Sequence, residues 1–236
     1  SERQAGYEAL KDLPARTTDG TEVSLMLNAG LDLDMDMMKQ AGADGVGLFR
    51  TEFQFLVSES LPKLNDQIDL YKRVLDKADG KPVIFRTVDL GGDKVLPALN
   101  LQREENPALG WRSIRFALDH KGLFRRQLLA LVRAAGERPL TVMFPMVTVA
   151  SEFEEARDLL LTEVEWSAKR TGRRPSRVEV GVMLETPALA YGLPELAGKA
   201  EFLSVGTNDL MQFFFAADRM TPHVSDRYDL VSPSAL

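Results

Sequence analysis

Six short apolar runs, separated by segments of helical periodicity, constrain the fold of this chain more than any other feature of its sequence. The runs are rich in β-branched residues and are continuous rather than alternating, a pattern typical of strands buried on both faces of a parallel sheet. They occupy residues 23–29, 45–50, 82–90, 140–147, 178–185 and 202–206. Alternating strands and helices form either a doubly wound open sheet or a β/α barrel.

Polar residues stand at the carboxyl ends of many of these runs, and this spread favours the barrel. A barrel draws its site from the ends of many strands, whereas a doubly wound sheet binds ligands at one crevice. The residues are Asn28, Arg50, Arg86, Asp89, Glu185, Asn208 and Asp209. A complete barrel has eight strands in about 250 residues. Six runs therefore predict an α/β fold that is an incomplete (β/α)8 TIM barrel with six β/α units.

We expect the barrel domain to occupy residues 21–236 and to be truncated at its C-terminus, because the sequence stops after the sixth run. A long helical insertion separates Asp89 from Pro139. Residues 1–20 are polar and predict a linker or a helix tail from an upstream domain.

Two motifs predict where helices begin. Thr186 precedes Pro187, which places a capping hydroxyl before a proline at the first helical position. Ser151 stands three residues before Glu154, the spacing of a capping box.

Composition excludes several classes of protein. The net charge of −6 argues against a general affinity for nucleic acid or for an anionic membrane, so we expect neither partner. There is no cysteine, which excludes disulfides and thiolate metal sites. No apolar run has the length of a membrane span or the pattern of a signal peptide. The expected location is the cytoplasm.

Two arginines at matching strand ends are candidates for anion binding. Arg50 ends one run and Arg86 lies inside another. A buried arginine needs a partner, and a nearby carboxylate such as Glu52 or Asp89 would satisfy either one. Together they could instead form a bidentate clamp for a phosphate or carboxylate. If Arg86 awaits a ligand, replacing it by methionine should leave thermal stability intact.

Glu185 and Asp209 follow neighbouring strands, and two carboxylates at such positions repel unless a cation or a proton lies between them. Each could simply cap the following helix. As a pair they predict a magnesium site, since this ion takes one or two carboxylates and completes its shell with water and phosphate. Asn208 would then donate a hydrogen bond to the phosphate that completes the magnesium shell.

Other candidates are weaker. Arg112 could contact the same ligand or lie on a solvated helix face, and Arg219 could reach back over the site or remain in solvent. Lys94 follows a pair of glycines that usually marks only a turn. Both histidines, His120 and His223, stand in polar segments and are expected at the surface.

The motifs, taken in order, resemble the phosphoenolpyruvate-binding barrel of enzyme I, the phosphoenolpyruvate–protein phosphotransferase family of the bacterial phosphotransferase system. The resemblance covers residues 23–236, and the final segment is more similar to the nitrogen-regulatory paralogue. The motifs are GVGLFRTEFQFL, FRTVDLGGDKVLP, EENPALGWRSIR, MFPMV, VGVMLETPA and GTNDLMQFFFAADR.

The resemblance implies a role for each candidate residue. It implies that phosphoenolpyruvate is held by Arg50, Arg86, Arg112, Asn208, Asp209 and Arg219. It implies magnesium as the cofactor, with Glu185 and Asp209 as its ligands.

The implied chemistry is the transfer of the phosphoryl group of phosphoenolpyruvate to a histidine on a separate domain, with release of pyruvate. The phosphate then passes to a phosphocarrier protein of the HPr type, and the parent enzyme is expected to be a homodimer. The family's phosphohistidine motif has no counterpart here, and neither does the cysteine that serves the family as a catalytic acid. We therefore expect no catalytic residue in this chain, which would be inactive alone.

Two rival interpretations remain open. Pyruvate phosphate dikinase and phosphoenolpyruvate synthase share the barrel and its magnesium chemistry, and they differ by a nucleotide-binding domain. A regulatory module that senses phosphoenolpyruvate without converting it would leave the parent protein without a phosphorylated histidine.

Overall fold

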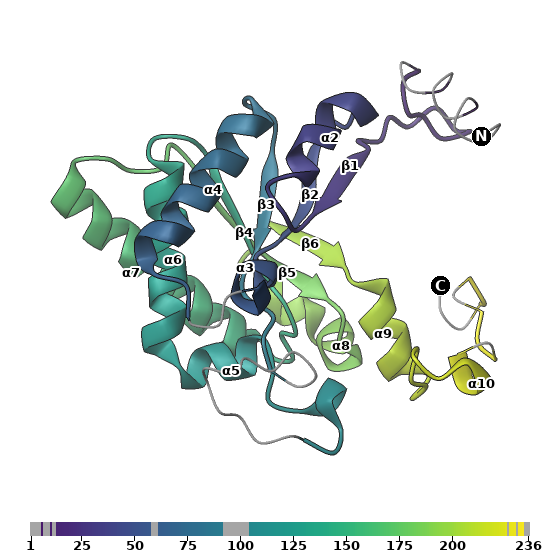
Figure 1. Ribbon diagram of the computed structural model, residues 1–236. Helices are drawn as coiled ribbons and strands as arrows, with labels where there is room; N and C mark the ends of the chain where they lie inside the picture. Colours follow the sequence, from purple (N-terminus) through teal and green to yellow (C-terminus); the bar gives the residue numbers. More distant parts are fainter. Residues whose placement is uncertain are drawn as a thin grey trace.

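The computed structural model describes residues 6, 10, 13–57, 61–91, 104–225, 227–229 and 231–233. Its six strands form one parallel sheet in which every strand pairs with the next along the chain (Figure 1). The strands are β1 (Met26–Ala29), β2 (Gly45–Arg50), β3 (Val83–Arg86), β4 (Leu140–Phe144), β5 (Val178–Leu184) and β6 (Phe202–Val205).

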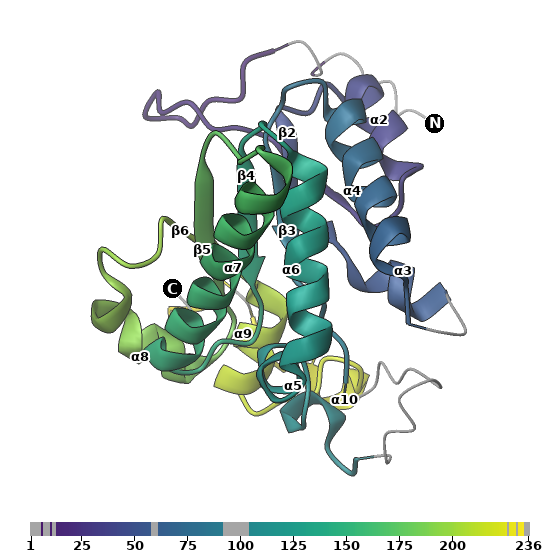
Figure 2. The ribbon, with the colours of Figure 1, turned by 90° about the vertical axis from the view of Figure 1, so that its left-hand side faces the viewer.

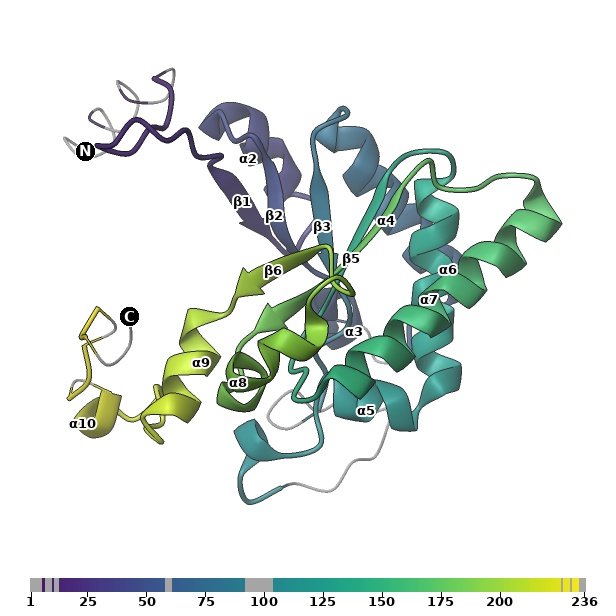
Figure 3. The same cartoon turned by 180° about the vertical axis from the view of Figure 1, so that it is seen from behind.

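The strand order β1-β2-β3-β4-β5-β6 confirms the prediction of a barrel-type fold and excludes a doubly wound sheet. A doubly wound sheet reverses its strand order at a switch point, whereas a barrel adds strands in one direction. In the described part of the chain β1 and β6 do not pair, so the sheet curls but stays open at these two edges (Figure 3). The fold is therefore an incomplete β/α barrel of six strands.

Helices alternate with the strands, and the larger ones cover the convex face of the sheet. Figure 2 shows α2, α4, α6 and α7 side by side on this face. The helices are α2 (Asp34–Ala41), α3 (Glu52–Val57), α4 (Leu64–Ala78), α5 (Ile114–Asp119), α6 (Lys121–Ala135), α7 (Ala150–Thr171), α8 (Pro187–Leu196), α9 (Thr207–Phe214) and α10 (Pro222–Ser225), with a 3₁₀ turn, η2 (Pro107–Leu109).

The core lies between these helices and the sheet and is built around buried aromatic rings. Phe85 of β3 packs edge-to-face with Phe49 of β2 and with Tyr71 of α4, at centroid distances of 5.6 and 5.5 Å. Phe144 of β4 makes the same type of contact with Phe124 and Phe153, from α6 and α7. Each fully buried ring contributes about 1.5–3 kcal/mol, so this layer holds the inner strands in place.

The last strand does not share the burial of the inner ones. The side chains of β6 alternate between half-buried and exposed, and Leu203 and Val205 are 47% and 58% exposed. The expectation that this run is buried on both faces is wrong, because an edge strand packs on only one side.

One of the two predicted helix starts is confirmed. Thr186 caps α8, where its hydroxyl oxygen accepts a hydrogen bond from the backbone N–H of Leu189 at 3.4 Å. The capping box at Ser151 is wrong, since α7 already begins at Ala150. The carboxylate of Glu152 instead accepts hydrogen bonds from the backbone before the helix. None of the helices in the described part of the chain has the length and hydropathy that a membrane crossing needs.

Candidate functional site

The carboxyl ends of the inner strands bring the predicted residues to one edge of the sheet. Arg50 and Arg86 are register partners at the ends of β2 and β3. Leu184 and Val205 are register partners at the ends of β5 and β6; Glu185 follows Leu184, and α9 begins two residues after Val205. This arrangement follows from the parallel topology, in which the carboxyl ends of all strands face one way.

Arg86 already has carboxylate partners in the protein. Its Nη2 contacts Oε1 of Glu52 and lies 3.4 Å from Oδ2 of Asp89, and all three side chains are at most 10% exposed. Burial alone would lower the pKa of Arg86, but Glu52, Asp89 and Glu185 raise it above its usual value. The carboxylate partners that the sequence allowed for Arg86 are therefore present in the ligand-free protein, and the role of Arg86 in holding a ligand stays a prediction.

Arg112 is also buried and paired, which excludes a solvated helix face. Its Nη2 lies 3.0 and 3.1 Å from the two carboxylate oxygens of Asp89 and 3.6 Å from Oδ2 of Asp209. Ser113 donates a hydrogen bond to the same Asp89 carboxylate. Asp89 is thus a shared acceptor for cations from two segments of the chain.

The close approach of these segments depends on Gly91. Its φ of +101° lies in the left-handed region, and it forms an isolated antiparallel bridge with Arg112. A Cβ atom at this position would collide with the carbonyl oxygen of Trp111. The positive φ and the close approach of Trp111 therefore require glycine at this position, which the Gly-Gly pair in the sequence does not by itself indicate.

Arg219 reaches back over the site, although its side chain remains 46% exposed to solvent. Its Nη1 lies 2.8 Å from Oδ1 of Asp209, which is buried in the first turn of α9. The neighbouring Asn208 is exposed. Asp209 therefore faces a guanidinium group on each side, from Arg112 and from Arg219.

Arg50 differs from the other three arginines. No carboxylate among the described residues forms an ion pair with it, and its buried Nε makes no hydrogen bond there. Its guanidinium group lies over the ring of Phe53, with Cζ 4.6 Å from the ring centroid. Among the described residues, the prediction that a carboxylate pairs with Arg50 is therefore wrong. Arg50 retains hydrogen-bond donors for a ligand.

Glu185 is buried at 3% exposure and accepts a hydrogen bond from the backbone N–H of Met146 at 2.6 Å. Burial, and next the charge of Asp209, raise the pKa of Glu185 to about 7, against the lowering effect of Met146 N–H and Arg86. The predicted repulsion between the two carboxylates is therefore present. In the metal-free protein the raised pKa favours a proton on Glu185, and the guanidinium groups of Arg112 and Arg219 contact Asp209.

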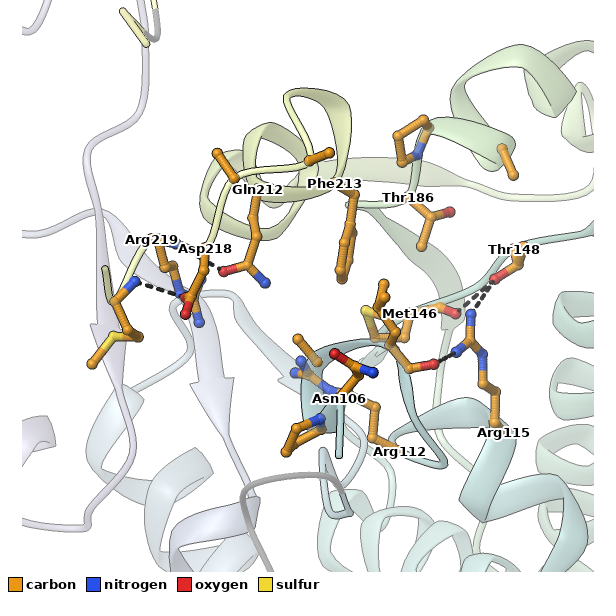
Figure 4. A pocket seen from close by; sticks show the side chains of 18 of the residues that line it. Asn106, Arg112, Arg115, Met146, Thr148, Thr186, Gln212, Phe213, Asp218 and Arg219 are labelled. Carbon is orange, nitrogen blue, oxygen red and sulfur yellow. Dashed lines mark hydrogen bonds between the residues drawn. The ribbon is translucent and has the colours of Figure 1, made fainter. Parts of the chain in front are cut away.

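A cavity of about 780 Å³ opens beside two of the predicted residues. Figure 4 shows Gln212 and Phe213 of α9 facing Asn106 and Arg112 across it. Arg112 and Arg219 line the cavity, whereas the other predicted residues do not.

Arg115 also lines the cavity. Its Nη1 donates to the carbonyl oxygens of Leu109 and Gly110 at 2.9 and 3.1 Å, and its Nη2 lies 3.5 Å from the hydroxyl of Thr148. These contacts hold one wall of the cavity in place.

Sequence reasoning missed several residues of this site. Ser113 and Met146 have φ values of +54° and +56°, an uncommon conformation for residues other than glycine, and both contact the carboxylates of the site. Met146 acts through its backbone, so its side-chain type carries no signal. Arg115 and Thr148 lie inside or next to two of the family motifs, but their residue types alone indicate no role. Lys94 lies outside the described residues.

The donor set fits magnesium. Glu185 and Asp209 supply carboxylate oxygens, which this ion prefers, and a cation between them would restore the ionised form of Glu185. No group of three or more acidic or histidine side chains in the described chain could hold a metal ion. Two carboxylates suffice where a phosphate and water complete the shell.

Comparison with known proteins gives one consistent result. A phosphoenolpyruvate–protein phosphotransferase of Bacillus subtilis is 42% identical over 234 residues, and one of Listeria innocua is 43% identical over 235 residues. Each comparison covers 99% of this chain and 41% of the relative. The chain thus spans about two fifths of the length of these relatives.

A homologous phosphoenolpyruvate–protein phosphotransferase of Haemophilus influenzae is 42% identical over 237 residues. The sequence model of the family described as "PEP-utilising enzyme, PEP-binding domain" matches residues 4–236. These matches confirm the resemblance drawn from the motifs. The chain belongs to the family of phosphoenolpyruvate-binding domains of the phosphoenolpyruvate-utilising enzymes.

Proposed function

We propose that residues 21–236 are the phosphoenolpyruvate-binding part of a phosphotransferase that moves the phosphoryl group of phosphoenolpyruvate to a histidine on a separate domain. Pyruvate is released, and the phosphate passes on to a phosphocarrier protein. The observation that carries this proposal is that Arg86, Arg112 and Arg219 share buried carboxylates at the ends of the strands, with Arg50 at the end of the strand next to that of Arg86. The 42% identity to phosphotransferases over the whole chain favours this activity over a dikinase, a synthase or a sensor.

The arginines suit a substrate that carries both a phosphate and a carboxylate. Guanidinium groups bind such anions with two parallel hydrogen bonds. Arg50 has a buried donor without a partner and no ion pair among the described residues, so it can bind the substrate without giving up a contact with a carboxylate. Arg112 and Arg219 share Asp209 in the ligand-free protein and must exchange that contact for the substrate.

Glu185 and Asp209 would hold magnesium, which when bound would offset negative charge on the transferring phosphoryl group and on the enolate that leaves. Asp209 links the metal and the substrate, because it contacts Arg112 and Arg219 in the metal-free protein. When the carboxylate of Asp209 coordinates the metal ion instead, the guanidinium groups of Arg112 and Arg219 become available to phosphoenolpyruvate. Metal and substrate are therefore expected to bind cooperatively.

Titration calorimetry of the chain with phosphoenolpyruvate, with and without magnesium, tests the proposal. Binding should be much tighter with magnesium. Asp209→Ala should weaken magnesium binding in the presence of phosphoenolpyruvate by more than about tenfold, because it removes a charged ligand. Asp158→Ala, which removes an exposed carboxylate on α7, is the matched control. Unchanged metal affinity in Asp209→Ala would refute the assignment.

A second pair of variants tests the arginine clamp. Arg50→Gln should weaken phosphoenolpyruvate binding by more than about tenfold. The protein should stay folded, since Arg50 has no ion pair in the described chain. Arg73→Gln is the control, because Arg73 is a half-exposed arginine that pairs with Asp32. Equal affinities of the two variants would contradict a role for Arg50.

The histidine, the carrier protein and the dimer belong to the parent enzyme in this proposal. Neither His120 nor His223 lines the cavity. His120 stacks on Phe116 instead, with ring centroids 4.3 Å apart. The full-length protein should therefore form a phosphohistidine elsewhere, which phosphopeptide mapping after incubation with labelled phosphoenolpyruvate would locate.

A further inference from the structure

We propose that Gln127, on the helix behind the sheet, is a positioning residue for Arg86 and Asp89. It acts through a buried chain of hydrogen bonds that joins α6 to the carboxyl ends of β2 and β3. The proposal deepens the function proposed above and rests on it, because Arg86 is there assigned to substrate binding.

The backbone needs this support because β3 ends at Arg86, where the hydrogen-bond ladder stops. Residues 87–90 remain buried although they have left the sheet. Thr87 still donates its N–H to the carbonyl of Met143 at 2.9 Å. The carbonyl of Arg86 and the N–H of Val88 need other partners, since buried backbone groups are nearly always paired.

Gln127 supplies both partners, one directly and one through Thr51. Its Oε1 accepts from Val88 N–H at 2.9 Å, and its Nε2 donates to the hydroxyl of Thr51 at 2.9 Å. That hydroxyl in turn donates to the carbonyl oxygen of Arg86 at 2.9 Å. Thr51 and Gln127 are each 1% exposed, so water does not compete for these bonds.

The direction of every bond in this chain is consistent. Gln127 can accept only through its oxygen and donate only through its nitrogen, and Thr51 can accept one bond while it donates another. The Nε2 of Gln127 also lies 3.3 Å from the hydroxyl of Tyr71, which ties the amide to α4. The amide therefore has one satisfied orientation, and this orientation fixes the backbone on both sides of Thr87.

Arg86 and Asp89 flank residues 87 and 88, and the position of this fixed segment sets the positions of their charged groups. Arg86 contacts Glu52, which directly follows Thr51, and Asp89 directly follows Val88. A shift of the backbone at Arg86 or Val88 would move a guanidinium group or a carboxylate of the site. Positioning from behind the sheet therefore governs the geometry of the anion clamp.

Two variants break the chain at different points, and each has a matched control. Gln127→Leu removes all three bonds of the amide, and Thr51→Val removes only the hydroxyl that links Gln127 to the carbonyl of Arg86. Gln67→Leu is the control for the first, because Gln67 is equally buried and also contacts the hydroxyl of Tyr71, but it bonds to the carbonyl of Pro62 and not to the strand. Thr51→Ser keeps the hydroxyl and should restore the behaviour of the wild type.

Two readouts separate positioning from a loss of stability. Titration calorimetry with phosphoenolpyruvate and magnesium, at a temperature where circular dichroism shows every variant folded, should give about tenfold weaker binding for Gln127→Leu and Thr51→Val. Gln67→Leu and Thr51→Ser should stay within about twofold of the wild type. The Nε–H resonance of Arg86 should shift in the first two variants only.

The outcomes distinguish this inference from the proposed function. If the wild type does not bind phosphoenolpyruvate, the proposed function fails, and the Arg86 resonance alone decides the positioning role. An unchanged resonance in Gln127→Leu and Thr51→Val, or affinities equal to that of Gln67→Leu, would overturn it. If Gln127→Leu fails to fold, the comparison of Thr51→Val with Thr51→Ser decides the positioning role in its place.

Discussion

Glu185 should make the metal-free protein less stable as the pH rises, and Glu185→Gln should remove this effect. The pKa of Glu185 is raised from 4.5 to about 7, chiefly by burial and next by the charge of Asp209. The folded state therefore binds more protons than the unfolded state between these two values, so the free energy of unfolding falls as the pH rises through this interval. The effect is complete about one pH unit above the pKa of the folded state, near pH 8.

The size of the effect follows from the shift. A difference of one pKa unit corresponds to about 1.4 kcal/mol, so the shift of Glu185 corresponds to about 3 kcal/mol lost between pH 4.5 and pH 8. Glutamine is nearly isosteric, keeps an oxygen for the N–H of Met146 and carries no charge. The stability of Glu185→Gln relative to the wild type should thus rise by about 3 kcal/mol across this range.

Urea unfolding in the presence of a chelator, followed by circular dichroism at several pH values, measures this difference. Glu154→Gln corrects for the loss of a carboxyl group in general, since Glu154 is a partly exposed residue that pairs with Lys199. Asp209→Asn should shrink the effect, because it removes the second cause of the shift. A relative stability of Glu185→Gln that stays constant from pH 4.5 to pH 8 would refute the reasoning.

Three further results are expected. Arg86→Met should destabilise the protein by about 3–5 kcal/mol in urea unfolding, because Glu52 and Asp89 lose a buried cation; a stability equal to the wild type would show that the pair is not structural. Gly91→Ala should lower the melting temperature, since its Cβ would collide with Trp111; a neutral effect would argue against the close approach. The chain incubated with labelled phosphoenolpyruvate and magnesium should yield no phosphoprotein, and a stably labelled histidine would contradict the separation of substrate binding from the nucleophile.

The strands can be predicted from the sequence because continuous apolar runs report burial. The run at 45–50 predicts both bounds of β2, Gly45–Arg50. The runs at 82–90 and 140–147 are too long at their carboxyl ends, where β3 and β4 stop at Arg86 and Phe144. The residues beyond these points stay buried but leave the hydrogen-bond ladder to form the loops of the site. The hydropathy of the sequence indicates that these residues are buried, but it does not indicate that they no longer pair with a neighbouring strand.

The partners of the charged residues could not be predicted from the sequence alone. The candidates at Arg50 and Arg86 follow from the parallel topology, which brings the ends of neighbouring strands together. Which arginine pairs with a carboxylate depends on distances between distant segments. Glu52 contacts Arg86 and not Arg50, although Arg50 is only two residues away in the chain.

The sequence by itself determined the alternation of strands and helices, the edge at which polar side chains collect, and the chemical types gathered there, because these depend on local patterns and on the direction of parallel strands. Only the tertiary structure decided the protonation of Glu185, the pairing of Arg219 with Asp209 and the bond from Gln127 to Thr51. These depend on burial and on distances of a few ångströms between segments far apart in the chain, to which no local pattern is sensitive.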